Sequence, residues 1–202
     1  MAPRKYTLDQ RAANAAATRE RIIDAAVAVY REIGVGAATI QAIARRADVA
    51  RGTVINQFGS ADAVLEAVLD RAVVEVEFPS ERDLDGATKP DPRVRRFVEV
   101  MYRFFERGVD WWQVFYADLH LPALQARQQR YNEIVWAFHA AAFGSLADDR
   151  IVGAAVRAFV DYAPWSALKA AGLTLDESIE LIGDALSNVA RQRRSQAKEQ
   201  AR

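Results

Sequence analysis

The chain has 202 residues, a formal net charge of zero and no cysteine. The lack of cysteine excludes disulfides and thiolate chemistry, and a polar beginning without an apolar signal core predicts a cytoplasmic setting. The length is sufficient for a full hydrophobic core. Since charges interrupt every long apolar stretch, we expect no membrane-spanning segment.

Charge is distributed unevenly along the chain. Residues 1–62 carry nine Lys and Arg against six Asp and Glu, whereas residues 63–190 carry thirteen against twenty. Residues 191–202 carry five basic side chains and one acidic one. A basic N-terminal segment followed by an acidic remainder is typical of a protein that binds the phosphates of a nucleic acid at one end. We predict a DNA-binding domain over residues 1–60 and a second domain over residues 61–202 that ends in a basic tail.

Apolar residues recur at three- and four-residue spacing without sustained alternation, which predicts an all-α fold of about nine helices. In chain order, the expected helices cover residues 17–33, a short segment after Thr39, and residues 50–57, 61–76, 93–107, 109–119, 122–143, 149–171 and 174 into the tail. A capped turn from Thr7 to Gln10 would lengthen the first helix, and Thr174 with Glu177 forms a capping box. Residues 77–92 are expected to be a loop without helix, and Pro164 is expected to kink or break the eighth helix.

The segment from Thr39 to Phe58 has the pattern of two short helices joined by a tight turn. Its inward apolar positions are Ile40, Ile43, Ala44, Ala47, Val49, Val54 and Phe58. Its outward polar positions are Arg45, Arg46, Arg51, Thr53, Asn56 and Gln57. The segment therefore predicts a helix-turn-helix that contacts DNA.

The start of the second of these helices is expected to approach the floor of the DNA groove. The expected DNA contacts are Arg51, Gly52, Thr53 and Asn56 near the bases, Thr39, Arg46 and Gln57 at phosphates, and Arg4 and Lys5 in a flexible minor-groove arm. Arg51 offers a bidentate fork to guanine, and Gly52 permits close approach of the backbone. Two alternatives stay open: Arg45 and Arg46 form only a solvated helix face, and Arg4 and Lys5 are an ordinary chain end.

A set of residues at fixed spacing carries a family resemblance. The set comprises Gly34, Thr39-Ile40, Ile43-Ala44, Val49, Arg51-Gly52-Thr53-Val54 and Phe58-Gly59-Ser60. Over Arg19 to Leu65 the chain resembles the TetR family of bacterial transcriptional repressors. The resemblance implies an N-terminal three-helix DNA-binding module followed by a larger helical domain for effector binding and dimerisation. It also implies a homodimer that a small, largely apolar effector releases from a palindromic double-stranded DNA operator, with no cofactor.

The chain departs from the pattern of the family at several positions. Asp48 stands in the turn where Gly is usual, and it can adopt the left-handed conformation at modest cost. Ala50 replaces the usual Ser or Thr at the start of the recognition helix and loses its side-chain cap. Ile55, Gln57 and Ala61 stand where Tyr, His and Lys commonly contact phosphates. The alternative interpretation is therefore a ligand- or protein-binding helical module with degenerate DNA recognition.

Aromatic residues are concentrated in the second domain, where the resemblance implies a small-molecule pocket. The expected lining residues are Phe97, Tyr102, Phe105, Trp111, Trp112, Phe115, Tyr116, Tyr131, Trp136, His139 and Tyr162. Polar candidates for orienting a ligand are Glu106, Asp118, His120, Glu133, His139 and Asp161. Most of the rings are expected to be ordinary core. His120 with Asp118 is too sparse a set for a metal site, so no metal is expected.

The last two predicted helices carry apolar stripes wider than a surface helix needs. In the family these helices form a four-helix dimer interface. The expected interface residues are Ala154, Ala158, Tyr162, Ile179, Leu181, Ile182 and Leu186. The alternative is that the stripes only close the core of the subunit, and we expect both uses on different faces. The sequence has no Gly-rich phosphate loop and no Ser-His-Asp arrangement, so we do not expect an enzyme.

Overall fold

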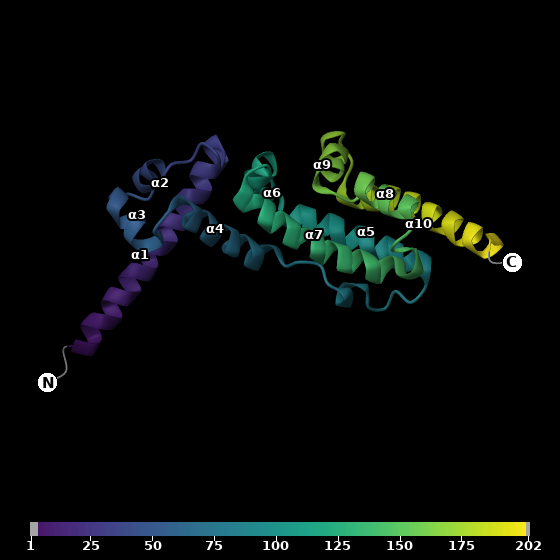
Figure 1. The fold of residues 1–202 in the computed structure, drawn as a ribbon, viewed down its shortest axis with the longest axis horizontal. Helices are drawn as coiled ribbons and strands as arrows, with labels where there is room; N and C mark the ends of the chain where they lie inside the picture. The colour runs from purple at the N-terminus through teal and green to yellow at the C-terminus, as the bar shows by residue number, and fades with distance from the viewer. Residues whose placement is uncertain (1–3, 201–202) are drawn as a thin grey trace. The chain divides into compact units, whose positions relative to one another are not determined.

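The computed structural model describes residues 4–200, with side chains from residue 10 onward (Figure 1). Within this range the chain is helical and contains no β-strand, which confirms the predicted all-α class. The elements are α1 (Arg4–Ile33), α2 (Ile40–Arg46), α3 (Arg51–Phe58), α4 (Ala61–Val76), η1 (Glu81–Leu84), α5 (Pro90–Arg107), α6 (Val109–Phe115), η2 (Tyr116–Asp118), α7 (Pro122–Phe143), η3 (Gly144–Leu146), α8 (Arg150–Phe159), α9 (Tyr162–Ala170) and α10 (Leu175–Gln200). None of these helices combines the length and the apolar character that crossing a bilayer requires.

The helix boundaries around the helix-turn-helix follow from local side-chain chemistry. Gly34 ends α1 with a φ of 80°, in the left-handed region that glycine adopts without strain. The Thr39 hydroxyl accepts a hydrogen bond of 3.1 Å from the Ala42 N–H and so caps α2. Asp48 has a φ of 52° in the turn, and Ala50 precedes α3 without a side-chain cap, both as predicted. These local rules place α2 and α3.

The first helix starts earlier in the chain than the predicted start at Ala17. α1 begins at Arg4, because the intervening run is rich in alanine, the strongest helix former. Gln10 donates to the Asn14 side chain one turn later, which supports this added length. The backbones of Arg4 and Lys5 therefore lie in the first turn of a helix and not in a flexible arm. Their side chains lie outside the described residues.

Pro164 divides the predicted helix over residues 149–171 into α8 and α9. The break falls at Val160, which has a φ of −116° and a ψ of 67°. A proline ring in a helix collides with the carbonyl four residues earlier, and Val160 occupies that position relative to Pro164. The Asp161 carboxylate then caps α9 by accepting a 2.7 Å hydrogen bond from the Tyr162 N–H. The described range consequently holds one helix more than expected.

The segment over residues 77–92 contains regular structure, so the prediction of a loop without helix is wrong in part. Residues 81–84 form the turn η1, and α5 starts at Pro90 and not at Arg93. Ser80 and Asp83 form a capping box at the start of η1, and Leu84 is fully buried. A capping box and one apolar anchor are sufficient to hold a turn in a sequence that otherwise favours loops.

The described chain divides into two compact units. The first comprises the residues up to Glu75 together with residues 113–126, and the second comprises Val76–Trp112 and the residues from 127 onward. The core of the first unit is formed by the fully buried side chains of Ile22, Ala26, Ile43, Val54, Val64 and Val68. The core of the second is formed by Phe97, Val98, Met101, Tyr102, Phe104, Phe105, Val152 and Leu186. The sequence-based division at residue 60 did not anticipate that residues 113–126 join the N-terminal unit.

The basic tail continues α10 as a helix. Arg191 and Arg194 both pair with Asp91 in the first turn of α5, and hydrogen bonding from Arg191 lowers the pKa of Asp91. Arg193 pairs at 2.8 Å with Asp149, the N-cap of α8. Part of the positive charge of the tail is therefore used to fasten the ends of two other helices.

Asp118 holds the turn between α1 and α2. Its Oδ2 accepts a 2.7 Å hydrogen bond from the N–H of the buried Val35. A Cβ atom at Gly34 would lie 3.1 Å from the same oxygen, so glycine leaves room for the carboxylate as well as for the positive φ. Asp118, which the sequence offered as a ligand-orienting group, is thus committed to the N-terminal unit.

Replacing Asp118 with alanine should destabilise the protein. The substitution leaves the N–H of Val35 buried without its acceptor, which costs about 1–3 kcal/mol in the free energy of unfolding. Urea denaturation checks this value. Asp118→Asn keeps an acceptor at the same place and should lose less. Equal stability of the alanine variant and the native protein would contradict the role given to Asp118.

Candidate DNA interface and ligand cavity

The helix-turn-helix is assembled on the predicted apolar positions. Ile43, Ala44 and Val54 are almost completely buried, and α2 packs against both α1 and α3. The N–H of Val49 donates to the Ala44 carbonyl at 3.0 Å and closes the turn. This packing leaves the outer side of α3 to solvent.

The predicted base-contacting residues lie at the start of α3 and along its outer side. Arg51 is the first residue of the helix and is exposed, as are Gly52 and Asn56, while Thr53 is half-buried. A Cβ atom at Gly52 would meet no other atom within 4 Å. Glycine is therefore not required there by the packing of the chain itself, and its bare backbone remains open to a partner.

The predicted phosphate-contacting residues have additional roles within the chain. Thr39 is exposed and caps α2. The Arg46 guanidinium pairs with Glu32 at 2.5 Å, so a phosphate would have to compete with that carboxylate. The Gln57 carbonyl accepts a 3.2 Å hydrogen bond from Arg19, which sequence reasoning had not assigned a role.

Arg19 supports the end of the recognition helix. Its guanidinium lies 4.1 Å from the ring centroid of Phe58, in addition to its bond to the Gln57 carbonyl. Such a cation–π contact fixes the helix end relative to α1. The two partners are 39 positions apart in the chain, and no local pattern in the sequence pairs them.

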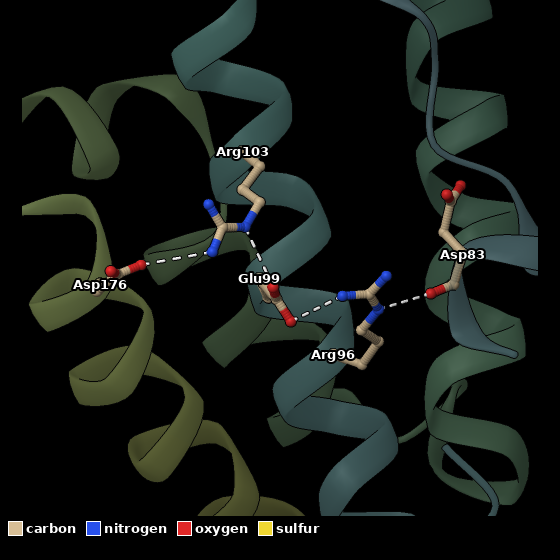
Figure 2. Close-up of polar contacts among 5 residues, drawn as sticks. All are labelled: Asp83, Arg96, Glu99, Arg103 and Asp176. Atoms are coloured by element: carbon tan, nitrogen blue, oxygen red, sulfur yellow. Dashed lines mark hydrogen bonds and ion pairs between the residues drawn. The ribbon is translucent and has the colours of Figure 1, made fainter. Parts of the chain in front are cut away.

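A surface groove with a volume of about 640 Å³ lies along α5, α10 and the loop after η1. Figure 2 shows the ionic network in this region, in which Glu99 joins Arg96 and Arg103. Arg96 also donates to the Asp83 carbonyl at 2.8 Å, and Arg103 pairs with Asp176 at 3.4 Å. Since both cations of this network already have acidic partners, it stabilises the packing of η1, α5 and α10 and offers no free charge to a ligand.

The network makes stability depend on pH. Burial alone would raise the pKa of Glu99, but hydrogen bonds from Arg96 and Arg103 outweigh it and hold the pKa below 4.5. The unfolded chain therefore binds the proton first as the pH falls. The stabilisation is complete above the unfolded pKa and is lost as the pH drops through the folded pKa.

Glu99→Gln should remove this pH-dependent contribution. Because the side chains of the two arginines are nearly half exposed, we expect a loss of only about 0.5–1 kcal/mol at neutral pH. The difference in unfolding free energy between native protein and variant should shrink as the pH is lowered from 6 towards 3. Urea denaturation at a series of pH values measures it, and a difference independent of pH would contradict the assignment.

Most rings of the predicted pocket form the core of the second unit. Phe97, Tyr102 and Phe105 are completely buried, and the Tyr102 hydroxyl donates to the Phe159 carbonyl at 2.7 Å. Trp112 stacks on Tyr162 with ring centroids 5.7 Å apart. Of the remaining predicted lining residues, Phe115 and Tyr116 belong to the N-terminal unit and Trp111 to the second.

A separate cavity of about 430 Å³ lies between α7 and α8. Its lining residues are Gln128, Tyr131, Asn132, Val135, Trp136, His139, Gly153, Val156, Arg157, Val160 and Asp161. Tyr131, Trp136 and His139 were predicted as pocket residues, and Asp161 was a polar candidate. The other lining residues were missed, because whether a side chain faces a cavity or the core depends on how two distant helices pack.

The predicted dimer residues divide between surface and core. Tyr162, Ile182 and Leu186 are buried within the subunit, and Ile179 is half-buried. Leu181 remains 50% exposed, and Ala154 and Ala158 are also exposed. Ile151 and Phe159 on α8, which are not among the predicted interface residues, are 43% and 40% exposed. An apolar surface therefore remains on α8 and α10.

Comparison with known proteins identifies the family. Residues 22–68 match the family model described as bacterial regulatory proteins, tetR family. Residues 22–68 therefore form a DNA-binding domain of the TetR family of transcriptional regulators. The match covers the helix-turn-helix and the first half of α4, so DNA binding in regulation of transcription is shown at the level of the family.

The sequence relatives of this chain are transcriptional regulators. The regulator BetI of Serratia proteamaculans is 28% identical over 177 residues, which are 82% of this chain and 89% of that protein. BetI of Pectobacterium carotovorum is 29% identical over 55% of this chain and 60% of that protein. SrpR of Pseudomonas putida is 52% identical over 58 residues, or 29% of this chain and 27% of that protein. The match to SrpR is therefore shorter than the match to BetI of Serratia proteamaculans but has the higher sequence identity.

Solved structures share the fold of this chain. A TetR-like regulator from Rhodococcus sp. RHA1 has a TM-score of 0.61 at 18% identity, covering 84% of this chain and 93% of that one. A complex of SmeT with triclosan has a TM-score of 0.60 at 24% identity, covering 86% of this chain and 91% of that one. At these identities the likeness shows a shared fold.

Proposed function

We propose that this protein is a sequence-specific, cytoplasmic repressor that binds a palindromic DNA operator as a homodimer and leaves it when a small molecule binds. The observation that carries the proposal is the outer side of α3, where Arg51, Gly52 and Asn56 are exposed. None of the three is needed to bury the apolar face of the helix. A surface that folding leaves unused, at the start of a recognition helix, is available to read base edges.

Arg51 is the residue to which we assign base recognition. Its guanidinium is suited to a bidentate contact with the O6 and N7 atoms of guanine, worth about 1–3 kcal/mol of discrimination. Gly52 follows it directly and lets the backbone approach the DNA. The family's usual phosphate contacts are absent at Ile55, Gln57 and Ala61, so we expect a weaker dependence of affinity on salt than a fully equipped relative would have.

Arg51→Ala should weaken binding to the preferred operator by roughly tenfold to a hundredfold. Binding to unrelated duplexes should change much less, because that binding depends on phosphates. Selection of the preferred sequence from a random pool, followed by salt-titrated shift assays, measures both. Arg21→Ala, an exposed arginine of α1 outside the proposed interface, is the matched control. Unchanged selectivity of Arg51→Ala would show that another residue reads the sequence.

Gly52→Ala separates folding from DNA binding. Because a Cβ atom at this position meets nothing within 4 Å, the variant should be as stable as the native protein or more stable by about 0.5–1 kcal/mol. Operator binding should nevertheless fall, since the added methyl group stands between backbone and DNA. If the native protein itself shows no sequence preference, Arg51→Ala and Gly52→Ala cannot reduce one. That outcome would favour the alternative, a module with degenerate DNA recognition.

Dimerisation through α8 and α10 supports the proposal from the second unit. The exposed apolar side chains of Ile151, Phe159 and Leu181, together with two exposed alanines, would be removed from water by a second copy. Two copies related by a two-fold axis present two recognition helices about 34–36 Å apart, which matches successive major grooves.

Leu181→Arg should convert the dimer to monomers. Placing a charge at the centre of an apolar interface leaves it desolvated and unpaired, which costs several kcal/mol. Sedimentation velocity measures the change in oligomeric state, and operator affinity should fall with it. Val74→Arg is the control, since Val74 is 78% exposed on α4 and lies outside the proposed interface. A Leu181→Arg variant that remains dimeric would place the interface elsewhere.

Release by a small molecule requires that the two units communicate. The chain passes from one unit to the other within α6 and within α7, so two continuous helices belong to both. A ligand that fixes the position of one end of such a helix also restricts the positions that the other end can adopt. The structural relatives SmeT and EbrR were solved in complexes with triclosan and imidazole, which supports a ligand-binding body in this chain also. A nearly complete switch needs a preference of about 5.5 kcal/mol for the released state.

A further inference from the structure

The cavity between α7 and α8 contains a histidine with no hydrogen-bond partner. His139 is 2% exposed, and neither of its ring nitrogens has a partner among residues 4–200. Its ring lies between those of Trp136 and Phe143, at centroid distances of 4.8 and 4.7 Å, with Phe97 at 6.0 Å. Packing thus holds the ring while its polar atoms remain unsatisfied beside a cavity that it lines.

The imidazole is neutral at physiological pH. Burial, followed by the positive charge of Arg157, lowers the pKa of His139 to about 4 against a smaller opposing effect of the negative charge of Asp148. A neutral imidazole offers one N–H donor and one acceptor nitrogen. Leaving both unpaired away from water is unfavourable, so a ligand that supplies hydrogen-bonding atoms in the cavity gains from satisfying them.

Arg157 is an exposed residue of α8 that adds a positive charge to the lining of the cavity. Among the described residues, no carboxylate pairs with its guanidinium at 4 Å or less. Gly153 lies one turn earlier on α8, and a Cβ atom there would be 3.7 Å from the Arg157 Nη1. This is an ordinary van der Waals distance, so the guanidinium lies beside the backbone of Gly153, another lining residue. A planar guanidinium matches a carboxylate with two parallel hydrogen bonds.

The rest of the lining suits an aromatic body more than a second charge. Trp136 and Tyr131 lie along α7 and contribute ring surface, with three valines among the other lining residues. Asp161 also lines the cavity, but its Oδ1 already accepts the Tyr162 N–H, and burial raises its pKa. The volume of about 430 Å³ is at the small end for ligand pockets.

We propose that this cavity binds a small aromatic carboxylate, with the carboxylate on Arg157 and His139 and the ring against Trp136 and Tyr131. The inference deepens the proposed function, because it names the class of effector, and it rests on that function only for the effect on DNA. The ligand would hold residues 131–139 of α7, a helix whose first turn belongs to the N-terminal unit.

Binding of 2-naphthoate to the full-length protein without DNA tests the site. Titration calorimetry and quenching of tryptophan fluorescence give its affinity, and 2-naphthamide and 2-naphthylmethylammonium serve as neutral and cationic analogues. We expect 2-naphthoate to bind at least about tenfold more tightly than either analogue. Failure to bind at concentrations up to about 1 mM, or a preference for the cation, would overturn the inference.

Variants connect the affinity to the two proposed contacts. Arg157→Gln should weaken binding of 2-naphthoate by about tenfold or more while leaving the affinity of 2-naphthamide nearly unchanged. His139→Phe should also weaken it, and His139→Gln, which retains a donor and an acceptor, should restore part of the affinity. Arg150→Gln, an exposed arginine of α8 outside the lining, is the matched control. Equal effects of Arg157→Gln and Arg150→Gln would overturn the inference.

A separate measurement distinguishes this site from the proposed regulation. Shift assays with the selected operator record whether 2-naphthoate releases the DNA. Specific binding without release would uphold the carboxylate site and contradict its use as the regulatory site. Release by a different class of compound, with no binding of 2-naphthoate, would uphold the regulation and overturn the inference about this cavity.

Discussion

Burial of the apolar face of α5 is the constraint on which the body of the protein depends. The helix inserts Phe97, Tyr102 and Phe105 completely into the core, and it packs along α10 for much of its length. These rings form part of the core, and none of them lines the cavity between α7 and α8. At that cavity His139 contacts Phe97 from the core side, and its ring nitrogens are unsatisfied. The same packing therefore forms the core of the second unit and leaves the ring nitrogens of His139 without hydrogen-bond partners beside the cavity.

Features that depend on neighbouring residues were predictable from the sequence. The cap at Thr39, the left-handed Asp48 and the missing cap at Ala50 follow from side chains within a few positions of each other. The break caused by Pro164 was predicted, but its place was not, because the ring acts on the carbonyl of Val160. The outer positions of α3 were also predictable, since a helix of eight residues with a clear apolar side has little freedom in what it exposes.

Features that depend on distant pairs were not predictable. Arg19 and Phe58, Val35 and Asp118, and Arg103 and Asp176 are each far apart in the chain. A charged residue in the sequence has many possible partners, and only packing selects one. The candidate pocket illustrates the same limit: composition located an aromatic body, but helical spacing alone cannot distinguish rings that fill a core from rings that border a space. The lining of the cavity by Arg157 and Gly153 depends on where the chain leaves α8 uncovered.

The return of residues 113–126 to the N-terminal unit has a consequence for engineering. A chimaera made by a cut in the loop after the recognition helix or at the end of α4 would transfer only part of the N-terminal unit. In this chain such a graft would separate the turn at Val35 from Asp118, its acceptor, which is encoded more than eighty positions later. A transferred DNA-binding unit would have to include residues 113–126, or the recipient protein would have to supply a carboxylate at the position of Asp118. The N-terminal unit of this protein is therefore compact in space but is formed by two segments that are separate in the sequence.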